Sequence, residues 1–253
     1  MNATIIQYIA LAWIIIAVVM FPILLRITAP YGRHSKKNWG PMIDNRLGWI
    51  LMESPSFFIF ISLVLFGPQN QSAIVWILFS LWTVHYFNRS FIFPLRTKTS
   101  GERMPVIIMF SAIFFNLINA TINGYWFGFV APPYPENWLT DPRFIIGGII
   151  FLAGFFINQA ADKKLIDLRK GGRKGYFIPR GGLFDYISCP NFFGEILEWT
   201  GFALMAWNLP SLSFAVWTAA NLIPRALDHH RWYNSYFKDE YPKKRKAVIP
   251  FVL

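Results

Sequence analysis

Apolar runs of about twenty residues recur along the whole chain, and they constrain its fold more than any other feature. They cover residues 4–25, 49–66, 73–95, 106–130, 144–161, 190–207 and 209–223. A helix needs about 20 apolar residues to cross a hydrocarbon core of roughly 30 Å. With 55% hydrophobic residues among 253, the chain is predicted to be an all-α polytopic integral membrane protein with seven transmembrane helices. Because the last two runs are short and Pro210 interrupts them, six spans is the alternative.

The positions of the basic residues predict an orientation. With the N-terminus outside, the segments 26–46, 96–103, 162–182 and 225–253 lie in the cytoplasm and carry five, three, seven and seven Lys or Arg. The outside segments 67–72 and 131–143 carry only Arg143. Cytoplasmic loops are enriched in Lys and Arg, so we expect the N-terminus outside and the C-terminus in the cytoplasm. The net charge of +11 then reflects topology and anionic lipid head groups.

The rest of the composition excludes several classes of protein. Basic residues dispersed between the spans argue against a nucleic-acid partner. The single Cys189 excludes an internal disulfide and a cysteine-based zinc cluster, and we expect no metal site. No Gly-x-Gly-x-x-Gly motif follows a strand, so a Rossmann domain is excluded. Without a repeat or a soluble segment, residues 1–253 are expected to form one membrane-embedded domain.

Glu53 is the one acid in the run 49–66. A carboxylate at that depth costs on the order of 3 kcal/mol unless it faces a partner, a cavity or a substrate. The next run ends with His85, Tyr86, Asn88 and Arg89 within about one helical turn. One interpretation is an interfacial belt in which Arg89 extends to the head groups. The other is a cavity that Tyr86 shares with Glu53.

Three further polar stripes follow helical spacing. The first contains Asn116, Asn119 and Asn123, which either bond neighbouring helices or line a polar cavity. The second contains Asn191, Glu195 and Glu198, on a helix that Ser188 is expected to cap. The third contains Arg225, His229 and Tyr233, on a helix predicted to begin at Pro224.

The second and third stripes belong, with Asn158, Asp162 and Arg169, to the predicted cytoplasmic ends of the last three runs. Arginine binds phosphate through its planar fork. Acids and amides bind ribose hydroxyls and carboxamides, and tyrosine stacks on rings. This mixture favours a large phosphorylated ligand with a nucleobase.

Several motifs carry a family resemblance. They are 181–186 (Gly-Gly-Leu-Phe-Asp-Tyr), 191–199 (Asn-Phe-Phe-Gly-Glu-Ile-Leu-Glu-Trp), 229–233 (His-His-Arg-Trp-Tyr) and the C-terminal 241–251. Upstream, 53–56 (Glu-Ser-Pro-Ser), 85–89 (His-Tyr-Phe-Asn-Arg) and 141–144 (Asp-Pro-Arg-Phe) also match. Over roughly residues 45–253 the chain resembles the steroid 5α-reductase family.

The resemblance implies a seven-helix membrane enzyme that uses NADPH to reduce the Δ4 double bond of 3-oxosteroids. It implies that Glu53 and Tyr86 are catalytic and bind the 3-keto oxygen. It implies a cofactor site formed by Asn158, Asp162, Arg169, Tyr176, Asn191, Glu195, Glu198, Arg225, His229 and Tyr233. The substrate side is then mainly the first four helices, and the cofactor side is mainly the last three with the C-terminal tail. The chain departs from the vertebrate pattern at Ala160 and Asp228, where those members carry histidine.

The chemistry of such a reduction agrees with these residues. Hydride delivered to C5 builds negative charge on the carbonyl oxygen, and a tyrosine hydroxyl held by a buried carboxyl group can stabilise that enolate. The enolate then takes a proton at C4, from water or from a nearby acid that the sequence does not identify.

The expected partners are a hydrophobic steroid that enters from the membrane and the lipid bilayer, with the protein a monomer. The expected location is the endoplasmic reticulum or the bacterial inner membrane, with the cofactor site facing the cytoplasm. Two alternatives stay open. One is an S-adenosylmethionine-dependent methyltransferase of the isoprenylcysteine type, and the other is a non-enzymatic sterol-binding protein. The methyltransferase gives Glu53 and Tyr86 no clear task, and in the sterol-binding protein the polar stripes would only bond neighbouring helices.

Overall fold

The computed structural model describes residues 2–28, 32–34, 39–68, 72–97, 101–172 and 175–253. Its long helices are α1 (Ala3–Arg26), α2 (Asn45–Leu65), α3 (Ala73–Phe87), α5 (Val106–Tyr125), α6 (Pro142–Asp167), α7 (Pro190–Ala206) and α8 (Leu209–Phe237). A π-helix, Asn88–Ile92, continues α3 directly into the short α4 (Phe93–Arg96). Within the described ranges these seven long helices confirm the predicted all-α class, while the count of seven membrane spans stays a prediction.

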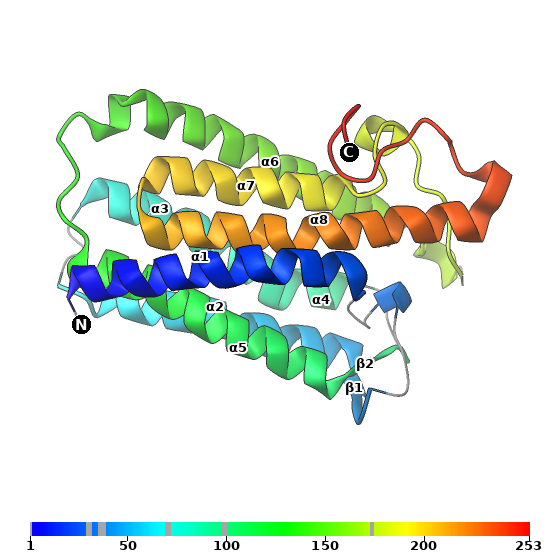
Figure 1. Ribbon diagram of the computed structural model, residues 1–253, viewed down its shortest axis with the longest axis horizontal. Helices are drawn as coiled ribbons and strands as arrows, with labels where there is room; N and C mark the ends of the chain where they lie inside the picture. Colours follow the sequence, from blue (N-terminus) through cyan, green and yellow to red (C-terminus); the bar gives the residue numbers. More distant parts are fainter. Residues whose placement is uncertain (1, 29–31, 35–38, 69–71, 98–100, 173–174) are drawn as a thin grey trace.

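The helices lie side by side along the long axis of the molecule, with the N-terminus at one end and the C-terminus at the other (Figure 1). Among the described residues, four helical segments are long and apolar enough to cross a membrane: Ala3–Arg26, Asn45–Leu65, Val106–Val130 and Pro142–Asp167. This supports a multi-pass membrane protein. The predicted orientation stays a prediction.

One small sheet interrupts the helical pattern. Strand β1 (Met42–Asp44) pairs antiparallel with β2 (Arg103–Pro105), with Ile43 opposite Met104. Figure 1 places this two-stranded sheet at the same end of the bundle as the C-terminal segment. The pairing ties the segments that precede α2 and α5, the two helices that carry Glu53 and Asn116.

Polar side chains begin most of the long helices. Asn2, Asp44, Ser72, Asp141 and Asn208 each accept a hydrogen bond from a backbone N–H in the first turn, which satisfies donors that a helix start leaves open. Arg143 also donates to both carboxyl oxygens of Asp141, at 2.9 and 2.8 Å. These bonds lower the pKa of Asp141 to about 2.

Two local predictions were wrong. Ser188 does not cap α7, because the helix begins after Cys189 without a side-chain cap. The Ser188 hydroxyl instead contacts the hydroxyl of Tyr241 at 2.7 Å and Nδ1 of His230 at 2.6 Å, which joins the C-terminal segment to α8. Pro224 does not begin a helix but lies inside α8. Proline removes one helical hydrogen bond, and packed neighbours make this tolerable in a membrane protein.

Helices α6 and α7 are in backbone contact through four glycines. A Cβ atom on Gly154 would lie 2.4 Å from the amide nitrogen of Glu198, and one on Gly194 would lie 2.5 Å from that of Asn158. One on Gly201 would lie 2.4 Å from the amide nitrogen of Phe151, and the fourth, Gly147, faces Gly201. Small residues allow such close approach where lipid removes the hydrophobic driving force between helices. The glycines therefore set how the polar stripe of α7 lies against α6.

This interface predicts different effects of alanine substitution at two adjacent glycines, Gly147 and Gly148. In Gly147→Ala the new methyl group would lie 2.7 Å from the carbonyl oxygen of Gly201, whereas in Gly148→Ala it would lie 3.6 Å from Sδ of Met205. Both variants gain the same helix propensity. We expect Gly147→Ala to lose roughly 1–3 kcal/mol of stability through overpacking and Gly148→Ala to lose none. Thermal unfolding in detergent measures both, and equal midpoints would contradict close packing at Gly147.

Candidate functional site

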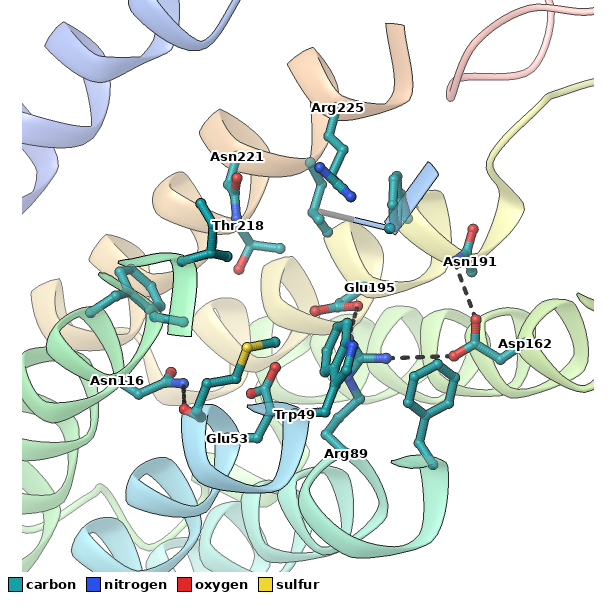
Figure 2. Close-up of a pocket in the computed structure, with 18 of the residues that line it drawn as sticks. Trp49, Glu53, Arg89, Asn116, Asp162, Asn191, Glu195, Thr218, Asn221 and Arg225 are labelled. Atoms are coloured by element: carbon teal, nitrogen blue, oxygen red, sulfur yellow. Dashed lines mark hydrogen bonds and ion pairs between the residues drawn. The ribbon is translucent and has the colours of Figure 1, made fainter. Parts of the chain in front are cut away.

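A cavity of about 530 Å³ lies among α1, α2, α3, α5, α6, α7 and α8. This volume is in the range of small-molecule sites. One part has mainly apolar walls, formed by Met20, Leu24, Met52, Ile108, Ala112, Phe115, Phe214 and Trp217. The other part is polar and is lined by Arg89, Asp162, Arg169, Tyr176, Asn191, Glu195, Asn221, Arg225 and His229. Figure 2 shows residues of both parts around one space.

Glu53 of α2 and Tyr86 of α3 both line this cavity. In Figure 2 the Glu53 carboxyl group points into the cavity near Asn116. Asn116 is held by α2, because its amide donates to the Met52 carbonyl at 2.5 Å and accepts from the Ser56 hydroxyl at 2.9 Å. Tyr86 is buried and lies close to Ser56 and Glu53. The expected shared cavity is therefore present, and the catalytic roles of both residues stay predictions.

The asparagine stripe of α5 serves both of the purposes considered for it. Asn116 lines the cavity. Asn123 instead accepts a hydrogen bond at 3.2 Å from the Ser211 hydroxyl of α8 and donates to the Asn119 carbonyl at 3.0 Å. The stripe thus changes from cavity wall to interhelical contact along its length.

Arg89 points inward and does not extend to the head groups. Its Nη1 lies 3.5 Å from Oδ2 of Asp162, and its Nη2 lies 4.0 Å from Oε2 of Glu195. The guanidinium also lies over the rings of Trp49 and Phe93, 5.2 and 4.9 Å from their centroids. Arg89 belongs to the π-helix after α3, a distortion that is frequent at functional sites.

The residues assigned to a cofactor site meet from three separate parts of the chain. Seven of the ten line the cavity: Asp162, Arg169, Tyr176, Asn191, Glu195, Arg225 and His229. Asn191 donates to Oδ1 of Asp162 at 3.2 Å, which joins α7 to α6. Arg169 pairs with Glu102 at 3.1 Å, and both line the cavity rim.

The other three assigned residues lie behind the wall of the cavity. Asn158 donates to the Asn191 carbonyl at 3.0 Å and so supports a lining residue. The Glu198 carboxyl group contacts Nδ1 of His85 at 2.7 Å. Tyr233 is buried against Tyr241, with parallel rings whose centroids are 5.2 Å apart.

Several lining residues were not assigned a role from the sequence. His85, Arg89, Trp49 and Asn221 belong to this group. A signal existed for Arg89, which lies three residues after Tyr86 and so shares its helix face. No comparable signal identifies His34, whose Nε2 lies 3.0 Å from Nδ1 of the lining residue His229. This contact depends on the path of the chain between α1 and β1.

Comparison with known proteins extends the resemblance over nearly the whole chain. A family model described as 3-oxo-5-alpha-steroid 4-dehydrogenase matches residues 102–253. The steroid 5-alpha-reductase DET2 of Gossypium hirsutum is 43% identical over 99% of this chain and 98% of its own length. The protein of the same name from Arabidopsis thaliana is 42% identical over 89% of this chain and 88% of its own.

An animal relative matches at a similar level. The 3-oxo-5-alpha-steroid 4-dehydrogenase 2 of Rattus norvegicus is 41% identical over 88% of this chain and 88% of its own length. Because plant and animal proteins match almost end to end, the chain belongs to the steroid 5α-reductase (3-oxo-5-alpha-steroid 4-dehydrogenase) family.

Proposed function

We propose that this protein reduces the Δ4 double bond of 3-oxo-Δ4 steroids to give 5α-reduced 3-oxosteroids, with NADPH as the reductant. The observation that carries the proposal is the shared cavity. Glu53 and Tyr86 lie in its mainly apolar part, and a cluster of arginines, acids and amides forms its other part. The printed names of the relatives describe the same activity.

The apolar part suits a steroid ring system. Its walls are aliphatic and aromatic side chains from α1, α2, α5 and α8, which exclude water from the reacting atoms. Excluding water strengthens each remaining electrostatic interaction. Two polar side chains, Glu53 and Tyr86, project from neighbouring helices into this environment. They are therefore placed to select a ligand with a carbonyl group at one end.

Tyr86 and Glu53 stabilise charge on the carbonyl oxygen in this scheme. The Tyr86 hydroxyl donates a hydrogen bond to the 3-keto oxygen, where negative charge develops as C5 is reduced. Glu53 lines the same cavity and interacts electrostatically with Tyr86, and in this scheme it orients that donor. Such preorganised donors usually give the largest single contribution to catalysis.

The polar part provides groups that match NADPH. Arg169 and Arg225 are suited to its phosphates. The amide of Asn191 and the carboxylates of Asp162 and Glu195 are suited to its hydroxyl and carboxamide groups. Phe192 stacks on His229 with 5.5 Å between ring centroids, which gives an aromatic surface for a base. When bound, NADPH supplies the hydride.

The proposal includes a place in the cell membrane. The chain functions as one domain, with the substrate side on the N-terminal helices and the cofactor side on α6 to α8. The N-terminus faces outward and the cofactor site faces the cytoplasm of an endoplasmic reticulum or bacterial inner membrane. The steroid enters from the bilayer, and the protein works as a monomer. This arrangement is supported by the many Lys and Arg in segments 162–182 and 225–253.

The two alternative functions have less support. A methyltransferase leaves Glu53 and Tyr86 without a task, and the relatives named above carry the names of a steroid 5-alpha-reductase and a 3-oxo-5-alpha-steroid 4-dehydrogenase rather than of a binding protein. Purified protein incubated with NADPH and a panel of 3-oxo-Δ4 steroids tests the proposal. We expect steroid-dependent NADPH oxidation and a 5α product. Binding of S-adenosylmethionine without NADPH turnover would favour the methyltransferase.

Glu53 and Tyr86, in the mainly apolar part of the cavity, give the first kinetic prediction. Glu53→Gln and Tyr86→Phe should each lower kcat/KM for a 3-oxo-Δ4 steroid by roughly 10²-fold or more, the scale of losing one oxyanion donor. The double variant should be only slightly worse than either single one, because residues that act together are not additive. Tyr8→Phe is the control, since Tyr8 is 68% exposed on α1. Turnover near wild type in either folded variant would leave Glu53 a packing residue.

The polar part gives the second kinetic prediction. Arg225→Ala should raise the KM for NADPH at least tenfold, because it removes about 1.5–3 kcal/mol of charge-assisted hydrogen bonding, and Asn191→Ala should raise it several-fold, because a neutral hydrogen bond contributes about 0.5–1.5 kcal/mol. Both should leave the steroid KM within about twofold. NADPH should also be preferred over NADH. The exposed neighbour of Asp162, Lys163, provides the control Lys163→Ala. An unchanged cofactor KM in both test variants would remove α7 and α8 from the cofactor site.

A further inference from the structure

A buried histidine and a buried glutamate form a pair that the scheme above does not use. Nδ1 of His85, on α3, lies 2.7 Å from Oε1 of Glu198, on α7. Their side chains are 3% and 0% exposed. Two ionisable groups removed from solvent this completely are costly to keep unless they are paired or functional. The reaction also lacks an assigned donor for the proton that C4 must receive.

The position of the His85 ring places it beside the proposed substrate cavity. His85 lines the same cavity as Tyr86 and Glu53. Its ring packs edge to face against Tyr86 and Trp199, at centroid distances of 5.0 and 4.6 Å, so its orientation is restrained on two sides. Nδ1 is engaged by Glu198, which leaves Nε2 as the ring nitrogen that Glu198 does not contact. Because His85 lines the cavity, Nε2 is the nitrogen that the proposal below assigns to the substrate.

We propose that His85 is the general acid that protonates C4 and that Glu198 is the positioning residue that holds it. This inference rests on the proposed reduction. Hydride addition at C5 leaves an electron pair shared between the 3-oxygen and C4. That pair forms the new C4–H bond as the Nε2–H bond of His85 breaks, and the electrons of the broken bond stay on Nε2. The neutral imidazole regains its proton from solvent before the next cycle.

The positions of His85 and Tyr86 suit two separate roles, in which Tyr86 binds the enolate oxygen and His85 protonates C4. The two residues are adjacent in the chain and both reach the cavity, so one can act on the oxygen of an enolate and the other on its α-carbon. A carboxylate bonded to one ring nitrogen fixes the tautomer and stabilises the imidazolium form, as in other histidine–carboxylate pairs. Glu198 contributes in this way without touching the substrate.

Charged groups from three other elements act on His85. They include Glu198 and Glu195 of α7 and Arg89 of the π-helix. Glu53 of α2 also interacts electrostatically with His85. Replacing Glu198 removes the carboxylate that contacts Nδ1 of His85. The imidazolium should then lose its proton at a lower pH.

A structural tie between α3 and α7 is the competing explanation. A tie would affect folding and the binding of both ligands, whereas a general acid would affect kcat and its dependence on pH. The buried bond between Ser211 of α8 and Asn123 of α5 is a matched control. It joins two helices but neither residue lines the cavity. Ser211→Ala should therefore reproduce the loss of a tie without a change in the pH profile.

The test measures kcat, both KM values and the pH profile of full-length His85→Gln, Glu198→Gln and Ser211→Ala in detergent or lipid. We expect His85→Gln to lower kcat by about 10²-fold or more, the scale of general acid catalysis, with both KM values within about twofold. The fall of kcat at alkaline pH should disappear in His85→Gln. In Glu198→Gln, which keeps the imidazole, it should move to lower pH.

Two results would overturn the proposal. One is a kcat of His85→Gln within about threefold of wild type. The other is a decrease of kcat at alkaline pH that occurs at the same pH in Glu198→Gln as in the wild type. This second measurement decides the question if His85→Gln does not fold. If the wild type is active and either result is obtained, the proposed role of His85 is refuted and the proposed function is not. A wild type that reduces no 3-oxo-Δ4 steroid refutes the proposed function and this role together.

Discussion

A guanidinium inside an apolar helical bundle is the constraint on which the rest of this site depends. Arg89 is 12% exposed, and a charge held there is costly by several kcal/mol unless opposite charges surround it. Asp162 of α6 and Glu195 of α7 provide them. Because Arg89 follows Tyr86 by one helical turn, the same pairs bring Tyr86 and the apolar part of the cavity against the helices that carry the proposed cofactor residues.

The backbone contact between α6 and α7 fixes the relative positions of the residues that these two helices carry. Gly154 and Gly194 let the two helices approach until a Cβ atom on either would meet the other backbone. Asn158 can then reach the Asn191 carbonyl, and Asn191 can reach Asp162. The acids that neutralise Arg89 are therefore carried by a rigid pair of helices, which is the condition for a preorganised site.

The sequence predicted the helices well and the directions of their side chains less well. Apolar runs of about twenty residues predict helices, because few other structures can cross a bilayer. They do not predict that α8 continues through Pro224 or that Arg89 turns inward. The first depends on which neighbours pack around the backbone carbonyl that Pro224 leaves unpaired, and the second on which acids neutralise the guanidinium. Glu198 shares a stripe with Asn191, but its closest partner is His85 from a helix more than a hundred residues earlier. Such contacts follow from the packing of α3 on α7.

The central claim is a conjugate reduction in which hydride goes to C5 and a separate proton goes to C4. Isotope tracing tests it most directly, with NADPH deuterated at the transferred position and a 3-oxo-Δ4 steroid in ordinary water, and then with the labels exchanged by using unlabelled NADPH in D₂O. The account predicts deuterium at C5 in the first product and at C4 in the second. Cofactor deuterium at C4, or solvent deuterium at C5, would contradict it.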